Sequence, residues 1–263
     1  LRMSRGLGDV YKRQETGQAM ELVKLALTLP HLDLRGLHCH VGSQVFGEDV
    51  YQRTLDIMVP FLAQIRDETG VTLSDLNLGG GYGVRYTAED EAIDIPARLA
   101  ELAAYLKEKT ERLGLPMPRF LMEPGRSIVA DAGMTLYTVG SVKRIPGYKQ
   151  YAAVDGGMTD NPRYALYQSR YTVYHAHKSG SMERFDVVGR CCESGDIIQP
   201  GVELPGDTCR GDILAVCTTG AYNYSMASNY NRLPRPAVVM LTPDRIYEAV
   251  RRETFADLTG LDL

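Results

Sequence analysis

Residues 75–83 have the sequence Asp75-Leu76-Asn77-Leu78-Gly79-Gly80-Gly81-Tyr82-Gly83, in which a short strand pattern leads directly into a run of glycines. Two other strand patterns lead in the same way into His38-Cys39-His40-Val41-Gly42-Ser43-Gln44 and Glu123-Pro124-Gly125-Arg126-Ser127. Apolar residues at helical spacing fill the intervals, so helix and strand patterns alternate over residues 15–145, which predicts an α/β fold with parallel strands. In a parallel barrel the carboxyl ends of the strands share the face that carries the active site, so we expect the three segments to meet there.

The sequence after Gly140 changes to short apolar segments separated by Gly, Pro, Asp and Asn, a pattern typical of an antiparallel β domain. We therefore predict an α/β plus all-β architecture, with part of a TIM barrel over residues 15–145 and a β domain over residues 146–263. The first part is about half of the roughly 250 residues of a complete barrel. Residues 1–14 show neither a helical nor a strand period and are predicted to be a non-native or disordered tail.

The charge balance argues against several classes of partner. The 263 residues include 29 Lys plus Arg and 33 Asp plus Glu, which gives a formal net charge of −4, whereas a surface for nucleic acid or anionic lipid usually carries a basic excess. No apolar run reaches the roughly 18 residues that would span a bilayer. Five cysteines without a C-x-x-C pair argue against a disulfide framework. These features predict a cytoplasmic protein that binds neither nucleic acid nor membrane.

The glycine run allows backbone N–H groups to approach a phosphate, because Gly79, Gly80 and Gly81 have no Cβ in the way. A plain tight turn is the alternative. The run is not a dinucleotide fingerprint, since Val84 stands where the third glycine would fall, and no Gly-Lys-Ser/Thr follows to make a Walker A loop. In His38-Cys39-His40 the alternatives are zinc, a histidine stacked on a flat ligand and a core histidine. No further Cys or carboxylate spacing completes a tetrahedral set, so we predict no metal.

Glu123 and Arg126 place a carboxylate and a guanidinium close together, as beside a phosphate-bearing ring; a surface turn is the alternative. The second half holds its own polar clusters, Asp155 to Arg163 and the vicinal pair Cys191-Cys192 followed by Glu193. A free thiol beside a carboxylate suits proton donation, and a buried structural cysteine is the alternative.

Together, the ordered motifs His-Val-Gly-Ser-Gln, Gly-Gly-Gly-Tyr-Gly, Glu-Pro-Gly-Arg, Cys-Glu-Ser-Gly-Asp and Gly-Ala-Tyr resemble those of the diaminopimelate decarboxylases, pyridoxal phosphate (PLP) enzymes of the alanine-racemase fold type. The resemblance runs from Glu15 to Leu263. It implies a barrel followed by a β domain, and a homodimer with active sites shared between subunits. It also implies decarboxylation of meso-2,6-diaminopimelate to L-lysine and CO2, the last step of lysine biosynthesis.

The resemblance implies a role for each motif residue. His40 would stack on the pyridine ring, Glu123 would bond the ring nitrogen, and Cys192 would return a proton to the substrate in the partner subunit's site. Residues implied at the cofactor are His40, Ser43, Gly79, Gly80, Gly81, Glu123, Pro124, Gly125, Arg126 and Tyr222. Residues implied at the amino-acid substrate are Arg126, Arg163, Tyr167, Glu193 and Tyr222. Two arginines suit a substrate with a second carboxylate, because each guanidinium presents paired donors in carboxylate geometry.

The sequence departs from the family at one point, since the tyrosine-alanine-x-lysine-alanine motif that carries PLP does not occur in it. We therefore expect this chain to be the C-terminal part of a longer enzyme and to be inactive by itself. The alternatives are a decarboxylase of the same fold acting on arginine, ornithine or carboxynorspermidine, and a non-catalytic regulator that keeps the PLP fold.

Overall fold

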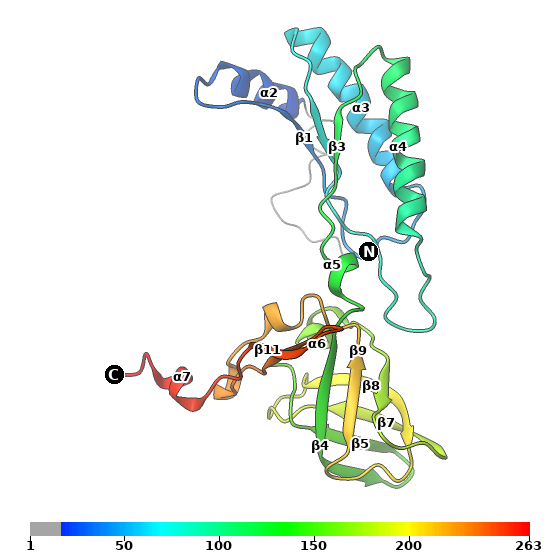
Figure 1. Cartoon of the computed structure of the whole chain (residues 1–263), viewed down its shortest axis with the longest axis vertical. Coiled ribbons are helices and arrows are strands. Elements are labelled where there is room, and N and C mark those ends of the chain that lie inside the picture. Colours follow the sequence, from blue (N-terminus) through cyan, green and yellow to red (C-terminus); the bar gives the residue numbers. More distant parts are fainter. Residues whose placement is uncertain (1–16) are drawn as a thin grey trace. The chain divides into compact units, whose positions relative to one another are not determined.

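The computed structural model describes residues 17–263, which divide into two compact units (Figure 1). The first unit contains residues 17–84 and 91–127, and the second contains residues 85–90 and 128–263. The prediction for the tail 1–14 lies outside the described residues. Each unit is described by itself below.

The first unit is an α/β arrangement around three parallel strands, β1 (Gly36–His38), β2 (Asp75–Asn77) and β3 (Arg119–Leu121), in the order β1-β2-β3. Three helices separate or precede them, α2 (Gln18–Thr28), α3 (Val50–Thr69) and α4 (Ile95–Arg112), and Figure 1 shows α3 and α4 side by side along the strands. Asp94 caps α4 by accepting the N–H of Ala97 at 3.0 Å. The predicted partial barrel is confirmed.

The core of the first unit lies between the helices and the sheet. Residues on one face of α3, including Leu55, Val59 and Ile65, are fully buried against Leu76 of β2 and Leu106 of α4. Apolar side chains at intervals of three and four along α3 place this face toward the strands. The packing fixes the three strands in register, and with them the segments that follow their carboxyl ends.

The second unit is built on a six-stranded sheet in the order β6-β9-β4-β5-β7-β8. Its strands are β4 (Met134–Ile145), β5 (Lys149–Val154), β6 (Val173–His175), β7 (Met182–Val188), β8 (Ile197–Pro205) and β9 (Ile213–Cys217). Neighbouring strands are antiparallel, as the sequence predicts, except that β5 and β7 are parallel. The exception arises because the chain passes through β6 at the far edge of the sheet before it returns as β7.

Short elements complete the second unit. They are α6 (Arg163–Tyr167), the 3-10 turns η1 (Tyr224–Met226) and η2 (Tyr230–Arg232), the antiparallel pair β10 (Val238–Leu241) and β11 (Ile246–Val250), and α7 (Phe255–Thr259). A further short helix, α5 (Arg126–Val129), lies where the chain passes from one unit to the other.

The division between the units falls after Ser127, whereas the sequence analysis places β4 with the barrel and begins the β domain at residue 146. The difference has a simple physical cause. Strand β4 forms its backbone ladders with β5 and β9, so its hydrogen bonds belong to the β domain. Along residues 17–263, no helix combines the length and apolar character that crossing a bilayer requires.

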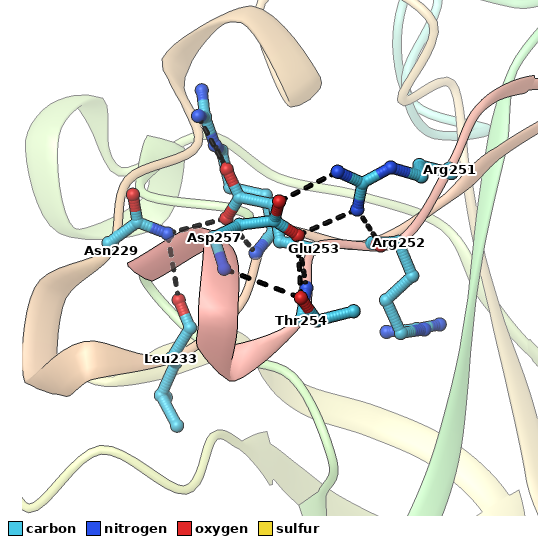
Figure 2. A network of polar contacts seen from close by, with 8 residues as sticks. Asn229, Leu233, Arg251, Arg252, Glu253, Thr254 and Asp257 are labelled. Carbon is cyan, nitrogen blue, oxygen red and sulfur yellow. Dashed lines mark hydrogen bonds and ion pairs between the residues drawn. The ribbon is translucent and has the colours of Figure 1, made fainter. Parts of the chain in front are cut away.

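A polar network ties the segment after β11 to the segment after η2 (Figure 2). Glu253 accepts hydrogen bonds from Asn229 Nδ2 at 2.6 Å, Arg235 Nε at 2.7 Å and the Arg235 backbone N–H at 2.8 Å. Four residues further on, Asp257 forms a capping box with Thr254 and accepts hydrogen bonds from both terminal nitrogens of Arg251. The network therefore fixes the path of the C-terminal residues through charge-assisted bonds.

The network predicts an acid-dependent contribution to stability. The Arg235 guanidinium and its other donors lower the pKa of Glu253 to about 2, from a usual value near 4.5. Because the folded pKa is the lower one, the stabilisation is complete above pH 4.5 and is lost as the pH falls through about 2. We expect Glu253→Gln to lower the urea midpoint at pH 7, measured by circular dichroism, and to have a much smaller effect at pH 2, where Glu253 is about half protonated in the folded protein. Glu248→Gln, at an exposed carboxylate of β11, is the control. If Glu253→Gln lowers the urea midpoint by the same amount at pH 7 and at pH 2, the acid-dependent stabilisation does not come from Glu253.

Candidate active site

In the first unit, a carboxylate and two polar side chains meet at the carboxyl ends of the parallel strands. The register pairs His38 of β1 with Asn77 of β2 and Asn77 with Leu121 of β3, and Glu123 follows two residues after Leu121. Asn77 Nδ2 donates to Glu123 Oε1 at 2.9 Å, and His38 Nε2 lies 3.3 Å from Glu123 Oε2. Both carboxylate oxygens therefore have a defined partner, while the Glu123 side chain is 57% exposed and accessible to a ligand.

The glycine run brings His40 next to this carboxylate. The Gly80 N–H donates to His40 Nδ1 at 3.3 Å, and the Gly79 N–H donates to Asn77 Oδ1 at 2.8 Å. This contact uses His40 Nδ1 as an acceptor and orients the ring. A Cβ on Gly80 would lie 2.1 Å from the Glu123 carbonyl oxygen, and only glycine allows this approach.

The two N–H contacts bear on the predicted phosphate site. The N–H groups of Gly79 and Gly80 donate to protein side chains. These two glycines therefore behave as a tight turn, which the sequence analysis gives as the alternative to phosphate binding. The predicted phosphate residues Ser43 and Arg126 do lie together, with Arg126 Nη2 donating to Ser43 Oγ at 3.1 Å. The Arg126 side chain is buried, which orients it within the first unit.

His38, Cys39 and His40 do not converge as metal ligands. His38 lies beside Glu123 and His40 beside Gly80, while Cys39 is buried in the core, where burial raises the pKa of its thiol. Within the described residues, 17–263, no group of three His, Cys, Asp or Glu side chains forms a metal site. The His38 side chain is half exposed, so it is not the core histidine considered as an alternative.

In the second unit, two loops leave the same end of the parallel pair β5 and β7. Their pairing, with Ala153 opposite Val188, brings the loop 155–162 that leads to Arg163 and the loop 189–196 that carries the vicinal cysteines to one edge of the sheet. All the predicted site residues of the second half except Tyr167 and Tyr222 lie on these loops or directly after them. Tyr167 ends α6, and Tyr222 follows β9 with a positive φ of 63°.

Arg163 is a buried guanidinium that contacts no carboxylate within the part of the chain that the structure describes. It is 7% exposed, lies 5.1 Å from the ring centre of Tyr167 and 5.7 Å from that of Tyr222, and its Nε has no hydrogen-bond acceptor. Its terminal nitrogens contact Met226 Sδ at 3.9 Å and Ser169 Oγ at 3.5 Å, and the guanidinium also interacts with the Tyr171 hydroxyl. A buried cation normally has an anionic partner, so this arrangement suits a bound carboxylate.

The vicinal cysteines differ in environment. Cys191 is buried, and burial together with the neighbouring Asp196 carboxylate raises the pKa of its thiol. Cys192 is exposed. Glu193 Oε2 accepts the Tyr230 hydroxyl at 3.3 Å, and the charge of Glu193 raises the pKa of Tyr230. Cys191 thus matches the buried structural cysteine that the sequence analysis gives as the alternative, and Cys192 is the accessible thiol of the pair.

Sequence analysis missed two residues that the structure joins to the predicted set. Asn77 donates to Glu123 and accepts the Gly79 N–H. The sequence feature that could have identified it is a polar side chain at the end of an apolar strand, two residues before the glycines. Asp196, the last residue of the quoted Cys-Glu-Ser-Gly-Asp motif, received no role there, and it accepts backbone N–H groups from both loops of the second unit.

The comparisons with known proteins agree with these features. Residues 12–130 match the model of the pyridoxal-dependent decarboxylases, pyridoxal binding domain. Diaminopimelate decarboxylase of Bacillus subtilis (strain 168) is 44% identical over 249 residues, which are 94% of this chain and 56% of the relative. The enzyme of the same name from Staphylococcus aureus (strain COL) is 39% identical, over 92% of this chain and 57% of the relative.

Solved structures resemble the chain over a similar span. The crystal structure of diaminopimelate decarboxylase from M. jannaschii in co-complex with L-lysine matches with a TM-score of 0.86 at 32% identity, covering 95% of this chain and 56% of that one. The lysine/ornithine decarboxylase of Vibrio vulnificus complexed with putrescine matches with a TM-score of 0.69 at 25% identity, covering 82% and 56%. The chain thus spans just over half the length of the relatives that it matches.

Proposed function

From the match of residues 12–130 to the pyridoxal-dependent decarboxylases, we propose that the protein containing this chain is such a decarboxylase and converts meso-2,6-diaminopimelate to L-lysine and CO2. The observation that carries the proposal is Arg163, whose buried guanidinium has no carboxylate partner among residues 17–263. Ornithine, arginine and lysine have no second carboxylate to offer it, whereas diaminopimelate has one at the end remote from the reaction. The identity to diaminopimelate decarboxylases supports the same substrate.

The residues at the strand ends fit PLP as the cofactor. When bound, PLP draws off the electron pair that departing CO2 leaves on the substrate. Glu123, held by Asn77 and His38, would accept a hydrogen bond from the protonated pyridine nitrogen and keep the proton there. His40, oriented by Gly80, would present a flat ring face for stacking. The donor set thus provides an anion for the ring nitrogen and a flat partner for the ring.

Ser43 and Arg126 would bind the phosphate. Their side chains are already joined, and a hydroxyl beside a guanidinium is a suitable donor pair for an anion. Since Gly79 and Gly80 donate to protein groups, we assign their role to shaping the turn and expect the remaining backbone donors to come from Gly81 and the Glu123-Pro124-Gly125-Arg126 segment. Arg126 would also lie near the substrate, as the resemblance implies.

At the substrate, we assign the distal carboxylate to Arg163 and the distal ammonium to Glu193. The rings of Tyr167 and Tyr222 lie 5.1 and 5.7 Å from the Arg163 guanidinium, and cation–π contacts with both help to hold it in place. Cys192 would return a proton to the carbon that loses CO2. We propose that Cys192 and Glu193 act in the partner's site of a homodimer.

The cofactor lysine is assigned to sequence outside this chain. In the first unit, the described lysines Lys24, Lys107 and Lys109 lie on helices and pair with Glu68, Glu111 and Asp56. None lies at the carboxyl ends of the strands. We call the chain preceded by the upstream sequence of its relatives the full-length enzyme. All five cysteines are free, which agrees with the reducing conditions of the cytoplasm that we propose as its location.

The proposal is tested by CO2 release from the full-length enzyme with PLP. We expect turnover of meso-diaminopimelate and at most slight turnover of arginine, ornithine and carboxynorspermidine. Preference for one of these amines would transfer the assignment to a related decarboxylase. PLP binding without turnover of any of them would favour the non-catalytic regulator.

The two cysteines provide a second, internal test. In the full-length enzyme, Cys192→Ala is expected to reduce turnover on the order of 10²-fold or more, because it removes the proposed proton donor while leaving the cofactor residues in place. Cys191→Ala, the matched control, is expected to reduce turnover less than about threefold, since its buried thiol serves packing. Steady-state kinetics and PLP absorbance measure both. Equal losses at the two positions would remove the basis for choosing Cys192.

A further inference from the structure

Asp196, immediately before β8, is the last residue of the second of the two loops that leave the parallel pair β5 and β7. Its side chain is 4% exposed. Oδ1 accepts the Met158 N–H at 2.6 Å, and Oδ2 accepts the Cys191 N–H, also at 2.6 Å. One carboxylate therefore binds a backbone N–H in each loop. In the first loop the bound residue, Met158, precedes Arg163 by five positions, and in the second the bound residue, Cys191, directly precedes Cys192.

Backbone contacts extend the same connection. The Arg190 N–H donates to the Gly156 carbonyl oxygen at 3.2 Å, which joins the loops directly, and the Gly189 N–H donates to the Asp196 carbonyl oxygen at 2.9 Å. The Asp196 N–H in turn donates to the Glu193 carbonyl oxygen at 3.1 Å. Asp196 is thus fixed by its main chain inside one loop while its side chain reaches the other.

The loops leave no space for a displaced carboxylate. A Cβ added to Gly157 would lie 2.6 Å from Asp196 Oδ1, and one added to Gly189 would lie 2.3 Å from either carboxylate oxygen. A buried carboxylate is stable only when hydrogen bonds replace its hydration, and here backbone N–H groups supply them. The positions of the two loops therefore both depend on the Asp196 carboxylate, through Oδ1 for the first loop and Oδ2 for the second.

We propose that Asp196 is a positioning residue that holds the Arg163 loop and the Cys192-Glu193 loop in one fixed arrangement. This inference rests on the proposed function. Asp196 then holds in place both the residue assigned to the distal carboxylate, Arg163, and the residue assigned to proton return, Cys192.

The test uses Asp196→Asn in the full-length enzyme. Asparagine offers one acceptor oxygen where the carboxylate offers two, so one loop loses its anchor. We expect kcat/KM for meso-diaminopimelate to fall on the order of 10²-fold, with a rise in KM and a fall in kcat together, because the freed loop no longer keeps its position relative to the other. Arg163→Ala should act mainly on substrate preference, and Cys192→Ala mainly on kcat.

Asp186→Asn is the matched control. Asp186 is a similarly buried carboxylate of the same sheet that accepts a backbone N–H, from Gly201 at 2.8 Å, and its other partner is Lys149. It lies away from both loops, so its variant should lower stability without changing substrate preference. If Asp196→Asn and Asp186→Asn have the same kinetic parameters, the positioning role is refuted.

Two measurements do not depend on decarboxylation. In Asp196→Asn, amide exchange at Met158 or Cys191 should accelerate on the order of tenfold or more, and alkylation of Cys191 by iodoacetamide should rise relative to Cys192. Unchanged exchange at both amides overturns the inference whatever the substrate is. If the unsubstituted enzyme does not act on diaminopimelate, the proposed function fails, while these two measurements still decide whether Asp196 joins the loops.

A second variant covers the case in which Asp196→Asn does not fold. Gly157→Ala keeps the carboxylate but moves it, because the new methyl group meets Oδ1. It should produce the same combined change in kcat and KM and the same exposure of Cys191 to alkylation. A Gly157→Ala enzyme with the kinetics and labelling pattern of the unsubstituted protein overturns the inference.

Discussion

Replacing Glu123 with glutamine in the full-length enzyme is expected to leave PLP bound and to slow decarboxylation on the order of 10²-fold or more. Glutamine preserves the shape of the side chain and its contact with Asn77, but it removes the negative charge that keeps the pyridine nitrogen protonated. The unprotonated ring withdraws electrons less effectively, so the loss should fall on kcat. Single-turnover CO2 release gives the rate, and the absorbance of the bound cofactor gives its occupancy.

Asp75→Asn is the control for this substitution. Asp75 lies at the opposite end of β2 and pairs with Arg119 of β3 at 2.6 Å, so it changes a carboxylate on the same sheet without touching the proposed site. We expect its turnover to match that of the unsubstituted enzyme. Asn77→Ala should produce a smaller version of the Glu123→Gln effect, since it leaves the charge but removes a hydrogen bond that orients it. Normal turnover in Glu123→Gln would exclude the proposed contact with the ring nitrogen.

The convergence in the first unit could be predicted from sequence because it depends only on strand direction. Parallel strands in register bring their carboxyl ends together, so polar segments after β1, β2 and β3 had to share one edge. Which side chains then touch is a different question. Asn77 and His38 contact Glu123 across 46 and 85 residues of sequence, and no periodicity carries information about such pairs.

The second unit was less predictable for a related reason. Short apolar segments identify strands but not their order, and the parallel pairing of β5 and β7 depends on the path of the chain through β6. That pairing is what places the two polar loops at one edge. The role of Asp196 follows from it and could not be inferred earlier, because an aspartate after Ser-Gly reads equally well as a turn residue.

The choice between Cys191 and Cys192 shows a similar limit. Their positions differ by one residue, so composition and spacing treat them alike, and the sequence analysis chose Cys192 only by resemblance. The structure separates them by burial, since Cys191 points its thiol into the protein beside Asp196 and Cys192 is exposed. Neighbouring residues in an irregular loop can have opposite environments, which only the three-dimensional structure reveals.

Arg163→Ala is expected to have the other large effect, on substrate choice. If the Arg163 guanidinium binds the distal carboxylate, its removal leaves that carboxylate buried without a partner. Truncating one side of a buried charge pair typically costs on the order of 2–5 kcal/mol, so kcat/KM for meso-diaminopimelate should fall at least about tenfold. The preference for diaminopimelate over lysine and ornithine should shrink, because these amino acids lack the distal carboxylate and lose nothing. Arg163→Lys should recover the charge but not the paired donors, and only part of the preference.

A stability measurement separates this role from a structural one. The Arg163 guanidinium is buried, and none of its contacts in the second unit is a carboxylate, so it carries a desolvation cost that an apolar side chain of similar length would avoid. Arg163→Met is therefore expected to keep or raise the melting temperature of the protein without substrate while it abolishes the preference for diaminopimelate. Arg170→Ala, at an exposed arginine that pairs with Glu89, is the control and should change neither property. If Arg163→Met melts at a lower temperature and still discriminates against lysine and ornithine, Arg163 is a packing residue, and the assignment of diaminopimelate as substrate loses the observation that carries it.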